Sequence, residues 1–175
     1  MPAGAAATYG DGRISEADLN AQVREVLAAQ GKPLDTSDPG VAAGVLRRML
    51  TEDLVDMLAA SVGVTINQGS IDGMKAQYIS QAGSEEAFNA SLAQQGVAPS
   101  QIDDAIKLNL QAQALGMALD PSGTPETQGQ AVFSAVGGLS DELGVEISPR
   151  YGSWDPMTVS IGPAIDDVAT LPSAG

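Results

Sequence analysis

Apolar residues recur along this chain every three or four positions, which is the period of an amphipathic α-helix. Six segments show this pattern, and each begins at a residue suited to an N-cap or ends near a glycine. The apolar stripe of residues 41–61 is wide, which predicts a central helix contacted from several sides. The predicted helices span residues 15–30, 41–61, 67–82, 84–95, 100–119 and 124–143.

Short segments near both ends alternate between apolar and polar residues as β-strands do. Residues 7–14 contain a Gly-Asp-Gly turn, and residues 145–147 and 157–161 flank a second turn that holds Trp154. We therefore predict a mainly α fold with a small β element that pairs the N- and C-terminal segments. Trp154 is expected to anchor the terminal strands onto the helices. Residues 1–6 are predicted to be flexible, residues 7–161 to form one domain, and residues 162–175 to form an irregular tail.

Composition excludes several classes of function. Eight basic residues stand against 22 acidic ones, and this balance disfavours a nucleic-acid partner, because phosphate binding needs clustered cations. The chain has no Cys and no His, so thiol chemistry is excluded and the commonest general base and metal ligand is missing. We expect no cofactor and no bound metal.

The acidic residues have ordinary explanations. The stretch from Asp11 to Leu19 resembles the second half of a calcium-binding EF-hand loop, but Ala7 and Tyr9 would occupy its first ligand positions. A turn followed by an N-cap at Ser15 explains the same residues. The adjacent carboxylates at 85–86 and 103–104 lie near predicted helix starts, where the helix dipole favours negative charge. We therefore expect no enzyme, although a carboxylate pair brought together by the fold would change that expectation.

Methionine is the one residue type that suggests a binding surface. Met49, Met57, Met74 and Met117 lie on predicted apolar helix faces. Met side chains are adaptable and common on surfaces that accept varied partners, and they are also common in cores. The sequence leaves both interpretations open.

The order of the segments resembles the N-terminal chaperone domain of the SurA/PrsA group of extracytoplasmic foldases. The strand end GDGRIS leads into a helix, and Met49-Leu50 through Ala59 to Gly63-Val64-Thr65-Ile66-Asn67 matches the long helix and its Gly-Val exit. Two short helices and a long one follow. The closing ISPRYGSWDP is similar to the ending of actinobacterial SurA-like lipoproteins. The resemblance covers about residues 7–161.

The resemblance implies a chaperone-like module that binds unfolded or extended polypeptide through an apolar cleft lined by helices. We expect the contacts to be Met57, Met74, Tyr78, Phe88 and Leu92, because the two short helices should be held most loosely. Prolyl isomerase activity is not expected, because only residues 120–125 stand where the family's parvulin domain would be inserted and the chain has no His.

The resemblance also implies a location outside the cytoplasm. Members of the group are often held to the membrane by a lipid on an N-terminal Cys, and we expect such an anchor to have been removed together with the signal segment. The alternative function is a structural or assembly lipoprotein that docks to one specific cell-envelope partner. The acidic surface would then select a basic partner.

Overall fold

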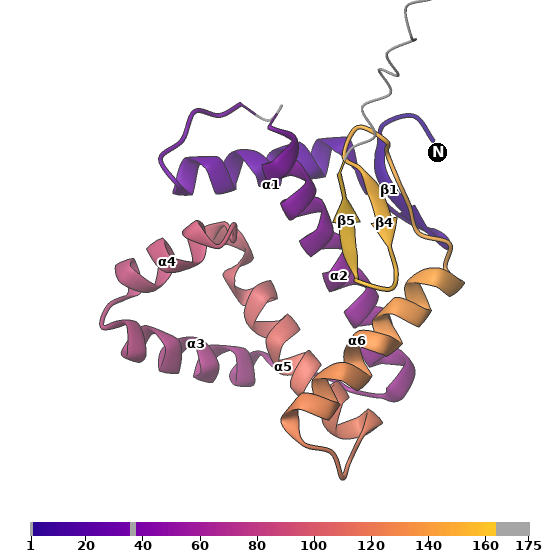
Figure 1. Cartoon of the computed structure of the whole chain (residues 1–175). Helices are drawn as coiled ribbons and strands as arrows, with labels where there is room; N and C mark the ends of the chain where they lie inside the picture. The colour runs from indigo at the N-terminus through magenta and orange to yellow at the C-terminus, as the bar shows by residue number, and fades with distance from the viewer. Residues whose placement is uncertain (1, 36–37, 164–175) are drawn as a thin grey trace, which may run out of the picture.

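The computed structural model describes residues 2–35 and 38–163, a mainly helical fold with a small antiparallel sheet (Figure 1). Its six α-helices confirm the predicted fold class. The helices are α1 (Glu16–Ala29), α2 (Pro39–Val62), α3 (Gln68–Ala82), α4 (Glu85–Gln94), α5 (Ile102–Leu119) and α6 (Pro125–Glu142), and the short 3-10 helix η1 (Pro99–Gln101) precedes α5. The strands are β1 (Ala5–Tyr9), β2 (Gly12–Ser15), β3 (Glu146–Ile147), β4 (Ser153–Asp155) and β5 (Ser160–Gly162).

A segment near each end of the chain contributes to a three-stranded sheet. β1 forms a hairpin with β2 and pairs along its other edge with β3, so the order is β2-β1-β3 and both pairs are antiparallel. Ala7 lies opposite Ile147, which confirms the predicted pairing of the terminal segments. The segment predicted to be flexible, residues 1–6, includes Ala5 and Ala6. Both belong to β1 and both are buried in the core.

A second hairpin, β4–β5, lies against the helices (Figure 1). The indole Nε1 of Trp154 donates a hydrogen bond to Ser140 Oγ on α6 at 3.0 Å, so this residue anchors the hairpin as predicted. The predicted strand at residues 157–161 is wrong in its first half. Residues 156–159 form the hairpin turn, Val159 has a φ of 46°, and β5 begins at Ser160. Gly162, assigned by the prediction to the irregular tail, belongs to β5, and residues 164–175 lie outside the described part.

Local sequence explains where the helices begin and end. The side-chain oxygens of Ser15, Asn67, Ser84 and Thr124 each accept a hydrogen bond from a backbone N–H in the first turn of the following helix. Such N-caps satisfy donors that a helix end leaves unpaired. Gly63 ends α2 in the left-handed region with a φ of 75°, which a glycine adopts without a steric penalty. These five boundaries agree with the sequence prediction.

Most of the buried apolar residues form one cluster, the main core, built by α1, α2, α5, α6 and the β1 sheet. α2 crosses the middle of the molecule and contacts α1, α5 and α6, which confirms that it is the central helix. The deepest side chains are leucines that are 0% exposed: Leu19, Leu46, Leu50, Leu54 and Leu115. Aliphatic packing of this kind supplies most of the free energy that opposes chain entropy.

A smaller cluster, the second core, lies between α3, α4 and the first half of α5. α3 and α4 project away from the sheet, and together with α5 they outline a triangle in Figure 1. The members are between 3% and 8% exposed: Ile71, Phe88, Val97, Ile102 and Ile106. α5 belongs to both cores, since Ile106 packs in the second and Leu115 in the main one. The described residues thus form two unequal cores joined by α5.

Candidate functional site

A cleft of about 510 Å³ opens between α3, α4 and α5, and we call it the α3–α4–α5 cleft. Its volume lies within the range of pockets that hold small ligands or side chains, roughly 300–1,000 Å³. Apolar side chains alternate in its lining with amide and hydroxyl groups. The lining residues are Tyr78, Gln81, Ala82, Phe88, Ser91, Leu92, Gln95, Val97, Ala105, Ile106 and Asn109.

The turn between α3 and α4 sets the shape of this cleft. Gly83 ends α3 with a φ of 86°, and Ser84 immediately caps α4. This tight corner brings Tyr78 and Phe88 together as a stacked pair with ring centroids 6.2 Å apart. Phe88 is only 6% exposed, whereas Tyr78 is partly exposed. Phe88 therefore belongs to the second core, Tyr78 packs against that core, and both side chains line the cleft.

The structure brings together three of the five predicted contact residues. Tyr78, Phe88 and Leu92 all line the cleft. Met74 packs against the second core and does not line the cleft. Met57 lies apart from these residues, on α2 with 41% of its surface exposed, and it belongs neither to the second core nor to the cleft lining.

Sequence reasoning missed the polar half of the lining: Gln81, Ser91, Gln95 and Asn109. A signal for them was present. Each of these residues follows an apolar lining residue by three positions: Tyr78, Phe88, Leu92 and Ile106 respectively. Side chains three apart share a helix face, so polar groups at this spacing lie beside the apolar ones.

The chemistry of the cleft follows from this lining. None of the described residues that line it is acidic or basic, although the chain as a whole carries a formal charge of −14. Uncharged amides and hydroxyls can pair with backbone N–H and C=O groups, while the aromatic and aliphatic side chains bury apolar surface. The cleft therefore fits an uncharged apolar segment that still carries backbone hydrogen-bonding groups.

A second, acidic hollow of about 200 Å³ lies between α2 and α5. Glu52 pairs with Arg48 at 2.8 Å, Asp56 pairs with Lys107 at 2.7 Å, and Asp53 accepts a hydrogen bond from the phenol of Tyr9. Burial raises the pKa of Glu52 above its usual value, and the neighbouring guanidinium only partly offsets this. Burial, followed by the hydrogen bond and charge of Asp53, raises the pKa of Tyr9 as well.

The carboxylates of Glu52, Asp53 and Asp56 each form an ion pair or a hydrogen bond within the protein. The described residues hold no group of three or more acidic side chains with the geometry of a metal site. The pairs noted in the sequence also lie as predicted: Glu85 and Glu86 in the first turn of α4, and Asp103 and Asp104 in the first turn of α5. At these positions the helix dipole stabilises negative charge.

Comparison of the sequence with protein-family models, with curated proteins and with solved structures gave no match. The similarity to the SurA/PrsA group therefore rests on the order of motifs in the sequence. No helix in the described part is long and apolar enough to cross a bilayer.

Proposed function

We propose that this protein is a chaperone-like module that binds apolar stretches of unfolded or extended polypeptide in the α3–α4–α5 cleft. The observation that carries the proposal is a cleft with no charged lining residue in a strongly acidic chain. The surrounding negative charge keeps the protein soluble, while the cleft accepts apolar surface. The resemblance to SurA/PrsA foldases supports the same function and a location outside the cytoplasm.

Binding in such a cleft would use neither a nucleotide nor a metal. Weak, rapidly reversible contacts suit varied clients, because adaptable side chains repack around different sequences. We propose that prolyl isomerase activity is absent, since the chain has no His for a parvulin-type active site.

The first experiment follows light scattering of a client enzyme as it unfolds on heating, with and without a modest excess of this protein. Suppressed aggregation that an added apolar peptide reverses is the expected result. Failure to suppress aggregation at any ratio would contradict the chaperone function.

A matched pair of variants tests whether the α3–α4–α5 cleft is where peptide binds. Ser91→Glu places a charge on an exposed lining position of α4 without removing a core side chain. Ala87→Glu adds the same charge to an exposed position of α4 outside the lining. We expect the first variant to weaken peptide binding about tenfold, which corresponds to about 1.4 kcal/mol, and the second to leave it unchanged. Equal behaviour of the two variants would remove the cleft from the proposal.

A specific observation also favours the alternative, an assembly protein that docks to one cell-envelope partner. Phe133 on α6 is 40% exposed and Met157 in the β4–β5 turn is 82% exposed, and both line a hollow of about 560 Å³. Exposed apolar side chains around a hollow are typical of protein contacts. A basic partner would complement the acidic surface, and a single partner captured by the wild type but not by Phe133→Ser would favour this alternative.

A further inference from the structure

A hollow of about 360 Å³ lies where the end of α1, the start of α2 and the link between α4 and η1 meet. We call it the Arg47 hollow. Its floor is apolar, with Val26, Val41, Val45 and Leu108 among the lining residues. Its polar lining includes Gln30, Lys32, Arg47, Arg48 and Thr51.

The charge of this hollow is opposite to that of the protein. Three of the eight basic residues of the chain line it, whereas none of its described lining residues is Asp or Glu. With 22 acidic residues in the sequence, a hollow whose charged described lining residues are all basic is a local reversal of charge. A ligand with one negative group is attracted here, but a highly charged anion is repelled by the rest of the molecule.

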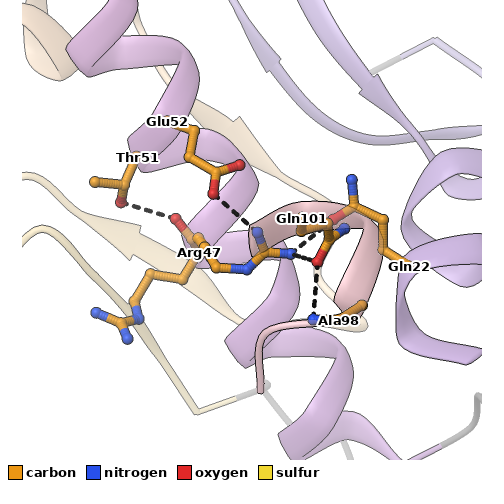
Figure 2. Close-up of polar contacts among 7 residues, drawn as sticks. Gln22, Arg47, Thr51, Glu52, Ala98 and Gln101 are labelled. Atoms are coloured by element: carbon orange, nitrogen blue, oxygen red, sulfur yellow. Dashed lines mark hydrogen bonds and ion pairs between the residues drawn. The ribbon is translucent and has the colours of Figure 1, made fainter. Parts of the chain in front are cut away.

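The three cations differ in how they are paired within the described part of the chain. Arg48 is held in place: it pairs with Glu52 at 2.8 Å and donates to Gln22 at 2.9 Å and to Gln101. Arg47 is the preceding residue on α2, and Figure 2 shows its side chain extending away from Glu52 and Gln101. Within the described residues, neither Arg47 nor Lys32 forms an ion pair.

Two buried polar atoms on residues of this lining have no hydrogen-bond partner. They are Nε of Arg48, a donor, and Oε1 of Gln30, an acceptor. The amide nitrogen of Gln30 is already used, since it donates to the carbonyl of Ala93 at 2.8 Å. Buried polar groups in folded proteins are almost always paired, so an unpaired donor and acceptor beside one hollow point to a ligand with complementary groups.

We propose that the Arg47 hollow binds the C-terminal residue of a polypeptide whose last side chain is apolar. The terminal carboxylate pairs with Arg47 and Lys32, and Arg binds carboxylates through its planar fork of donors. The amide N–H of the same residue meets the free acceptor on Gln30, and the side chain covers the apolar floor. One residue thus supplies an anion to the cations, a donor to Gln30 and an apolar group to the apolar floor.

This site is separate from the proposed cleft, because Gln95 alone among the described residues lines both the Arg47 hollow and the cleft. A peptide anchored by its end at Arg47 would pass Gln95 to enter the α3–α4–α5 cleft. That continuation rests on the proposed function, whereas the end-binding site does not.

The test uses N-acetyl-leucine as the smallest probe that carries all three features, with binding followed by amide chemical shifts in nitrogen-15 spectra of the full chain. We expect saturable shifts at the start of α2 and the end of α1, and at least tenfold weaker binding of the neutral N-acetyl-leucinamide. Equal binding of the acid and the amide would overturn the proposal. If 4-methylpentanoate, which lacks the amide N–H, bound as tightly as N-acetyl-leucine, the ligand would be a simple apolar acid and not a polypeptide end.

Three variants test whether N-acetyl-leucine binds in the Arg47 hollow. Arg47→Gln is expected to weaken N-acetyl-leucine binding about tenfold. Arg24→Gln is the matched control, because Arg24 is exposed on α1 and donates to the carbonyl of Asn20 on its own helix. Gly44→Leu offers a second route, since a Cβ at this helical position meets nothing within 4 Å and a larger side chain would occupy the hollow. Unchanged affinity in both Arg47→Gln and Gly44→Leu would overturn the assignment.

Discussion

The main core and the second core are built from the same kinds of aliphatic residue, but they differ in depth. Five leucines of the main core are 0% exposed, whereas every member of the second core retains at least 3% exposure. The main core is enclosed by four helices and a sheet. The second is enclosed by α3, α4 and one half of α5.

The difference shows how one chain can combine a stable support with an adaptable surface. Regions with few buried apolar contacts open locally at a lower free energy than the whole protein. The α3–α4–α5 cleft lies in the region with the shallower core, where repacking around a ligand costs least. Each prediction below tests this contrast between the two cores.

The largest expected effect comes from truncating the main core. Leu50 on α2 is 0% exposed, so Leu50→Ala removes contacts on all sides and should lower the free energy of unfolding by about 2–5 kcal/mol. Urea unfolding followed by circular dichroism measures this loss. Because α2 contacts α1, α5 and α6, the transition should remain cooperative as it moves to lower urea. A loss smaller than 1 kcal/mol would mean that the main core does not dominate stability.

The second prediction tests how closely the β4–β5 turn packs against α6 at the main core. A Cβ built on Gly137 of α6 would lie 2.4 Å from the carbonyl oxygen of Pro156, so Gly137→Ala must push the β4–β5 turn away. We expect a loss of about 1–3 kcal/mol, typical of overpacking. Gly138→Ala is the control one residue along, where a Cβ meets nothing within 4 Å. If the two variants had equal thermal midpoints, the close approach of hairpin and helix would not occur in solution.

The sequence correctly predicted the features that depend on interactions between residues close together in the chain. Ser15, Asn67, Ser84 and Thr124 cap helices through contacts with residues only three positions away, so their roles could be predicted without the fold. The six helices and the paired terminal strands follow from periodicity and turns in the same way.

The features that could not be predicted depend on which faces the fold brings together. Met57 lies on a long helix with apolar residues on several sides, and periodicity alone cannot say which neighbour covers each side. The Arg47 hollow gathers residues from α1, α2 and the link after α4, which are far apart in the sequence. No local sequence pattern indicates that Lys32 lines the same hollow as Arg47 and Arg48.

The third prediction is a smaller change, an increase in stability, and it concerns the second core. Gly73 lies inside α3, and a Cβ there meets nothing within 4 Å. Gly73→Ala should therefore stabilise α3 by about 0.5–1 kcal/mol, because alanine loses less backbone entropy in a helix. Hydrogen exchange should slow in α3 and α4 and stay unchanged in α2. Equal slowing in all three helices would show that the two cores unfold as one unit and would break the comparison.

The smallest effect concerns the contact that joins the two regions. Arg48 on α2 reaches both Glu52 and Gln101, the last residue before α5, so this group links the central helix to the start of the second core (Figure 2). Burial raises the pKa of Glu52 above its usual value, so the folded protein binds this proton more tightly than the unfolded chain does. The contribution of Glu52 to stability must then rise as pH falls through the raised pKa. It reaches its full value below about pH 4.5, where the folded and unfolded states are both protonated at Glu52.

Glu52→Gln removes this titration and keeps a hydrogen-bond acceptor for Arg48. The free energy of unfolding of the wild type, minus that of the variant, should therefore increase as pH is lowered from 7 toward 4.5, as measured by urea unfolding at several pH values. A difference that decreases with acid would mean that the ion pair with Arg48 outweighs burial and lowers the pKa. In that case the link between the two cores would be held by charge, and raising the salt concentration should loosen the second core first.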